Sequence, residues 1–167
     1  YAGDIDPIES AKTKERLGAL GFGEDILTVR RMNFAQIDEL AAEVGPFDFI
    51  LADLGVSSMQ IDNPERGFSY KNDGPLDLRL NPLQGVSAAE RLSSIAQDEL
   101  EGMLIENSDE PYAREIARQI VSDLRRGIKI ETTSSLHGEI EKALLREKMT
   151  AAERKEAVRK SSARTFQ

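Results

Sequence analysis

The sequence predicts an α/β protein in which a parallel, doubly wound sheet is followed by an inserted all-helical domain. Two observations lead to this fold class. Short apolar segments alternate with amphipathic helical segments over the first 53 residues, which is typical of parallel sheets. From about residue 85 onward, the periodic segments all have the spacing of helices. The chain is therefore expected to begin as a sheet and to continue as a helical bundle.

The alternating part is expected to contain three strands and two helices. Asp6 can cap the first helix and Pro7 fits its first position, where a backbone N–H would have no partner. Gly45 and Pro46 form a break before the third strand, which is apolar enough to be covered on both faces. The expected strands are residues 1–4, 25–30 and 47–53, and the expected helices are residues 7–20 and 34–44.

The helical part contains two capping boxes, in which a hydroxyl residue and a glutamate three positions later satisfy each other's backbone N–H groups. They begin at Ser87 and Thr150. Helices are also expected over residues 95–104, 111–126 and 133–145. The expected domains are residues 1–84 for the sheet and its long loop, 85–160 for the helical insertion, and 161–167 for the return to the sheet domain.

Composition excludes several classes of protein. The chain has 167 residues, a formal net charge of −8 and a pI near 4.8, which argues against a non-specific nucleic-acid coat protein. It has no cysteine and a single histidine, so we expect no thiolate or multi-histidine metal site. No apolar run approaches the roughly 20 residues of a spanning helix. We therefore expect a soluble, cytoplasmic protein, and both chain ends look interrupted.

Two of the expected strands end in aspartate. Ligands of open parallel sheets lie outside the carboxyl ends of the strands, and Asp4 stands there as a carboxylate able to accept the hydroxyls of a ribose. Asp53 ends the third strand, where it either faces a ligand or ties down the following turn. Phe34 follows the second strand and is either an adenine contact or a core residue.

A long loop and a basic helical region complete the candidate features. In this loop, residues 64–79, Arg66 and Arg79 suit phosphate or carboxylate groups, unless Asp–Arg pairs simply hold the loop in place. The helical part concentrates lysine and arginine among glutamates, which is either a solvated face or a contact for RNA phosphates. His137 has no neighbouring ligand residues and is expected to be an ordinary packing or surface residue.

Thirty consecutive residues resemble the signature block of a known family. DLGVSSMQIDNPERGFSYKNDGPLDLRLNP, residues 53–82, is similar to that block in the bacterial rRNA small-subunit methyltransferase H family, the MraW type. Further agreement comes from GDIDP at residues 3–7, YAREIARQIV at 112–121 and ARTFQ at 163–167. These segments are spread over the whole chain, so the resemblance is far more specific than a single short motif.

This resemblance implies a Rossmann-like, S-adenosylmethionine-dependent methyltransferase with an inserted helical domain. The family methylates N4 of a cytidine in small-subunit ribosomal RNA, so the expected cofactor is S-adenosyl-L-methionine and the expected partner is that RNA or the small ribosomal subunit. By position, Asp4, Phe34, Asp53 and Gln60 match cofactor-binding residues of the family. Asp53 is also the catalytic candidate, as an acceptor for the amine.

Two other functions fit some of these residues. A nicotinamide-dependent oxidoreductase also places an acid at the end of a strand to bind a ribose. A non-catalytic RNA-binding module is the other alternative, because the glycine-rich loop that the family wraps around the cofactor is not in this sequence. Comparing the stabilisation of the protein by S-adenosylmethionine and by NAD distinguishes the two cofactor readings.

Overall fold

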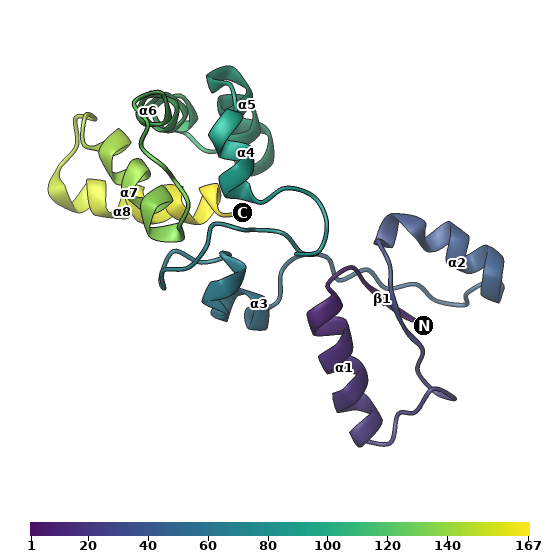
Figure 1. The fold of residues 1–167 in the computed structure, drawn as a ribbon. Helices are drawn as coiled ribbons and strands as arrows, with labels where there is room; N and C mark the ends of the chain where they lie inside the picture. The colour runs from purple at the N-terminus through teal and green to yellow at the C-terminus, as the bar shows by residue number, and fades with distance from the viewer. The chain divides into compact units, whose positions relative to one another are not determined.

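A computed structural model describes residues 1–167, and the chain forms two compact units. The first unit contains Tyr1–Gly55 and Leu80–Gln84, and the second contains Val56–Arg79 and Gly85–Gln167. Figure 1 traces the chain from the strand and helices of the first unit into the helices of the second.

The first unit is built on a parallel strand pair. β1 (Ala2–Asp4) pairs with β2 (Val29–Arg31), and α1 (Pro7–Ala19) lies between them in the sequence. Parallel strands require such a crossover connection, because the last residue of the first strand and the first residue of the second lie at opposite ends of the pair. In the register, Asp4 lies opposite Arg31. The carboxyl ends of both strands therefore meet at one edge, as the predicted fold requires.

Local signals determine the helices of this unit. The Asp6 carboxylate accepts hydrogen bonds from the backbone N–H groups of Ile8 and Glu9, at 2.9 and 3.2 Å, which confirms it as the cap of α1. After β2, a single turn of 3-10 helix, η1 (Phe34–Gln36), leads into α2 (Ile37–Val44). The second helix is thus also confirmed.

Two of the expected strands differ from the structure. Residues 25–28 form a turn and its exit, so β2 begins four residues later than expected. Residues 47–53 form no strand, and the side chains of Phe49, Ile50 and Leu51 are 79, 62 and 78% exposed. A strand needs a neighbour for its backbone groups, and the only ladder in the chain joins β1 to β2. The apolar pattern of this segment predicted a buried strand, but no other segment of this chain covers it.

The second unit consists of helices. Its elements are α3 (Ser58–Asp62), η2 (Pro64–Arg66), α4 (Ala88–Ser94), α5 (Gln97–Ser108), α6 (Ala113–Arg125), α7 (Thr133–Leu144) and α8 (Ala151–Thr165). α6 packs against α5 and α7, and α8 packs against α7 and α5. The capping boxes at Ser87 and Thr150 are formed. No helix in either unit combines the length and the apolar character needed to cross a bilayer.

The core of the second unit lies between α6 and α7. Ile116 and Ile120 of α6 and Ile140 and Leu144 of α7 are fully buried. Leu76 from the long loop is also buried in this cluster. Removing each such side chain from water contributes about 1.5–3 kcal/mol. The core therefore joins the loop to the helical bundle rather than to the strands.

The compact units do not coincide with the domain boundaries expected at residues 84 and 160. Residues 56–79 belong to the helical unit because their backbone bonds to the α6–α7 connection, with Pro75 and Thr132 forming an isolated antiparallel bridge. At the carboxyl end, α8 runs without a break through Ser161 and Ser162, which are both fully buried. The return to a sheet domain expected at residues 161–167 stays a prediction.

Candidate functional site

The carboxyl edge of the strand pair carries the first candidate residue. Asp4 is the last residue of β1, and one of its carboxylate oxygens accepts a 2.8 Å hydrogen bond from the backbone N–H of Asp6. This contact fixes the carboxylate above the amino end of α1. Asp4 is exposed, and its second oxygen has no hydrogen-bond partner in the protein. That oxygen is therefore available to a ligand hydroxyl.

Phe34 lies at the same edge. It is the first residue of η1, three positions beyond Arg31, which pairs with Asp4 in the parallel register. Its ring is 66% exposed, so the core role considered for it is not the one it has in this chain. Asn33, the cap of η1, accepts a hydrogen bond from Ala35 N–H at 3.0 Å and fixes the start of this turn. The structure thus brings an acid and an exposed aromatic ring to one edge of the sheet.

A cavity of about 410 Å³ opens at this edge. Asp4 and Phe34 do not line it themselves, but its lining residues come from the segments that contain them and from the 80–84 segment: Ile5, Arg31, Met32, Asn33, Ala35, Gln36, Asn81 and Gln84. Small-molecule sites combine a concave surface with a few polar groups that fix orientation. A cavity lined by several amides, in segments that also carry an acid and an exposed ring, suits a nucleoside.

Asp53 lies in an irregular, exposed segment of the first unit. It makes no hydrogen bond or ion pair in the structure, so the turn-bracing role considered for it is not formed here. Gly55, two residues later, has φ of +126°, a conformation that L side chains rarely adopt. Its catalytic role stays a prediction.

Gln60 belongs to the second unit and is 4% exposed. Its carboxamide oxygen accepts a 2.7 Å hydrogen bond from Ser57 N–H, while its own backbone N–H donates to the Ser57 hydroxyl at 3.3 Å. Together these contacts form the capping box of α3. The side chain of Gln60 thus determines where a short helix begins, and its cofactor role stays a prediction.

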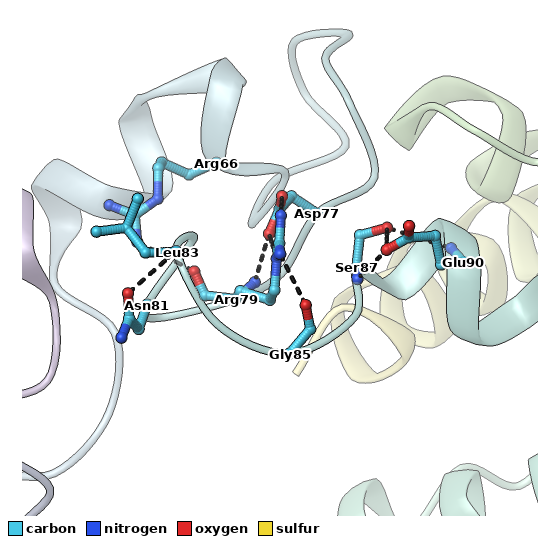
Figure 2. A network of polar contacts seen from close by, with 8 residues as sticks. All are labelled: Arg66, Asp77, Arg79, Asn81, Leu83, Gly85, Ser87 and Glu90. Atoms are coloured by element: carbon cyan, nitrogen blue, oxygen red, sulfur yellow. Dashed lines mark hydrogen bonds and ion pairs between the residues drawn. The ribbon is translucent and has the colours of Figure 1, made fainter.

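The two arginines of the long loop are structural in this chain (Figure 2). Arg79 donates from Nε and Nη2 to the two carboxylate oxygens of Asp77, at 2.8 and 2.6 Å, and from Nη1 to Gly85 O at 3.0 Å. Arg66 is buried and donates to Arg79 O at 3.1 Å. The loop is thus held by an Asp–Arg pair, the alternative to a substrate contact.

Asp77 is the residue that sequence reasoning did not single out. The guanidinium of Arg79 donates to its carboxylate and holds the pKa of Asp77 below its usual value, while the carboxylate raises the pKa of Arg79. A bidentate arginine–carboxylate pair is stronger and more directional than a neutral hydrogen bond. The two-residue spacing of Asp77 and Arg79 was the signal that could have identified this pair.

The fold and this edge define a mixed α/β protein of the Rossmann-like methyltransferase class. Within that class, the chain belongs to the MraW methylase family, whose family model matches residues 1–167. The resemblance seen in the sequence is therefore confirmed.

Several relatives are similar to the chain over its whole length. It is 60% identical over 167 residues to ribosomal RNA small subunit methyltransferase H 1 of Lachnoclostridium phytofermentans, covering 100% of this chain and 45% of that protein. It is equally similar to the protein of the same name from Agathobacter rectalis, of which it covers 47%. Identity to ribosomal RNA small subunit methyltransferase H 2 of Alkaliphilus metalliredigens is 56%, also over 47% of that protein. The chain thus spans about half the length of these relatives.

Proposed function

We propose that this chain is part of an S-adenosylmethionine-dependent enzyme that methylates N4 of a cytidine in small-subunit ribosomal RNA, acting in the cytoplasm. The observation that carries the proposal is the 60% identity, over all 167 residues, to relatives named ribosomal RNA small subunit methyltransferase H. Membership in a methylase family favours methyl transfer over the nicotinamide-dependent alternative. The partner is the RNA or the small ribosomal subunit that contains it.

The strand edge supports the cofactor assignment. The free oxygen of Asp4 suits a ribose hydroxyl, and the exposed ring of Phe34 suits the face of an adenine. When bound, S-adenosylmethionine supplies an electrophilic methyl group. In this proposal Asp4 and Phe34 hold its nucleoside, and Asp53 of the same unit approaches the part that carries the methyl group.

The amine requires alignment more than it requires a strong base. N4 of cytosine is conjugated with the ring, so its lone pair is a weak nucleophile, and positioning supplies much of the rate enhancement. Asp53 accepts a hydrogen bond from one N4–H, which orients the amine and raises its electron density. N4 would gain the methyl group as the bond between that group and the cofactor sulfur breaks, so that S-adenosylhomocysteine leaves, and N4 would lose one proton to Asp53 or water. The base must be unstacked to reach such a site.

Methyl incorporation into RNA tests this function. The complete protein is incubated with S-adenosylmethionine carrying a labelled methyl group and with small ribosomal subunits that lack their natural methylation. The label is expected in small-subunit RNA, and nuclease digestion followed by mass spectrometry is expected to identify N4-methylcytidine. Label on another nucleoside would overturn the N4 assignment, and absence of transfer would overturn the proposed activity.

Replacing Asp4 by alanine is expected to weaken S-adenosylmethionine binding about 10- to 100-fold, because the charge-assisted hydrogen bonds to the ribose are lost. Isothermal titration calorimetry on the complete protein measures the change. Asp25→Ala is the matched control, since Asp25 is exposed and precedes β2, at the opposite end of that strand from the candidate site. Equal affinities of the Asp4→Ala variant and the unsubstituted protein would remove Asp4 from the cofactor site.

A further inference from the structure

The charge of the chain is distributed unevenly. Residues 141–164 contain eight lysines and arginines against four glutamates, a formal charge of +4, whereas the whole chain carries −8. This stretch includes the end of α7, the 145–150 connection and nearly all of α8. A local excess of positive charge on an acidic protein indicates a place where a polyanion is attracted.

A groove of about 800 Å³ lies along this basic stretch. Tyr70 of the long loop and His137 of α7 line one part of it. Glu141 of α7, Leu145 and one side of α8 provide the rest, and the lining residues of α8 are Ala151, Ala152, Arg154, Lys155, Glu156, Val158 and Arg159. All of these residues belong to the second unit. The groove therefore combines small apolar side chains, two aromatic rings, three cations and two glutamates.

The two rings form a fixed pair. Tyr70 and His137 are stacked, with centroids 4.8 Å apart and planes inclined by 9°. His137 Nδ1 lies 2.7 Å from the Ser162 hydroxyl, and the Tyr70 hydroxyl donates to Arg159 O at 3.4 Å. These contacts confirm the packing role expected for His137. Because both rings are only partly buried, they give the groove a rigid aromatic wall.

The cations of the groove are held to different degrees. Arg154 donates to the carbonyls of Leu144, Glu147 and Met149 and so closes the connection between α7 and α8. Arg159 pairs with Glu156, whose pKa it lowers to about 2. Lys155 is exposed and makes no ion pair. Lys155 is therefore the cation best placed to pair with an incoming phosphate.

We propose that this groove binds an unpaired nucleotide of the RNA substrate, with its base against the Tyr70–His137 pair and its phosphate at Lys155. The inference rests on the proposed function, which supplies RNA as the partner. Single-stranded nucleic acids are bound by aromatic surfaces on which bases stack and by cations that contact the backbone. A neutral apolar peptide would match the alanines and Val158 but would leave the positive charge of this stretch without a partner.

The first test compares two lysines of the same helix. Lys155 lines the groove, whereas Lys160 does not and pairs with Glu156 at 3.4 Å. In the complete protein, Lys155→Ala is expected to weaken binding of a fluorescein-labelled single-stranded RNA about 3- to 10-fold. The plot of the logarithm of the binding constant against the logarithm of the salt concentration is expected to become less steep by about 0.7. Lys160→Ala makes the same change of net charge and is expected to alter affinity less than twofold.

The second test isolates the stacked base. Tyr70→Leu removes the ring and is expected to weaken RNA binding about 10-fold, whereas Tyr70→Phe keeps the ring and is expected to bind like the unsubstituted protein. An abasic oligonucleotide has the same phosphates without bases, so Tyr70→Leu is expected to leave its affinity unchanged. Thermal unfolding of each variant shows whether a loss of binding comes from a loss of structure.

The outcomes separate this inference from the proposed function. Equal losses for Lys155→Ala and Lys160→Ala would overturn the groove as a site, because only the general charge would matter. Equal losses of RNA and abasic affinity in Tyr70→Leu would overturn the stacked base. Neither result would affect the proposed function, because methylation by the unsubstituted protein is measured separately. Groove-dependent RNA binding without methyl transfer would instead support the groove and overturn the proposed activity.

Discussion

Replacing Asp53 by alanine in the complete protein is expected to lower kcat for RNA methylation about 10²- to 10⁴-fold, the range typical of a group that handles a proton in the transition state. The residue is exposed and has no partner in this chain, so its loss should leave the fold intact. Single-turnover methyl transfer under saturating S-adenosylmethionine measures the chemical step. Calorimetry on the same variant shows whether Asp53 also contributes to cofactor affinity.

Asp48→Ala is the matched control for Asp53, because Asp48 is an exposed aspartate of the same segment. It is expected to retain normal turnover. Asp53→Asn keeps an oxygen that accepts a hydrogen bond but removes the charge, so it distinguishes orientation of the amine from uptake of its proton. Turnover of Asp53→Ala within twofold of the unsubstituted protein would remove Asp53 from the chemistry.

Replacing Gly74 by alanine is expected to destabilise the second unit by about 3 kcal/mol, the upper part of the range for overpacking. A Cβ at this position would lie 2.1 Å from Pro64 O and 2.8 Å from the carbonyl carbon of the same residue. Both atoms are backbone, so they have no rotamer with which to move away. Urea unfolding followed by far-UV circular dichroism measures the loss.

Gly102→Ala is the control, and the expected effect has the opposite sign. Gly102 lies inside α5, and nothing stands within 4 Å of the position of an added Cβ. Alanine in a helix interior is more favourable than glycine by about 0.5–1 kcal/mol. If Gly74→Ala were as stable as the unsubstituted chain, the close approach of the loop to Pro64 would be wrong.

The helices were predictable because their signals are local. Asp6 and Pro7 mark the start of α1, and the boxes at Ser87 and Thr150 mark α4 and α8. In each case the residues that satisfy the first N–H groups lie within four positions of one another. Such arrangements form wherever the segment is placed, so the sequence is sufficient to find them.

The strands were predicted less well because their partners are distant in the sequence. The run at residues 47–53 is apolar enough for a central strand, yet no segment of this chain pairs with it. The boundaries of the compact units were not predicted for the same reason. Nothing in residues 72–76 themselves indicates that they bond to residues 131–134, about 60 positions later. Periodicity predicts which residues are apolar, not which segment will cover them.

In the candidate site, some positions were predictable from the sequence and some roles were not. Asp4 and Phe34 were placed at one edge by the rule for parallel strands, and the register of β1 and β2 confirms that shared edge. The two-residue spacing of Asp77 and Arg79 could have identified their pair, but the role of Arg66 depends on side-chain geometry that no spacing rule contains. Arg79 faces Asp77 and Arg66 donates back to the loop, so charge alone did not distinguish a binding residue from a brace.

The bonds between the long loop and the α6–α7 connection also bear on the order of folding. Leu76 N–H donates to Glu131 O, Thr133 N–H donates to Gly74 O, and the Thr133 hydroxyl donates to Asn72 O. During synthesis these partners leave the ribosome after the loop itself, at about 5–20 residues per second. The loop that carries the family signature must therefore wait several seconds for residues 131–134 before it can take its final conformation.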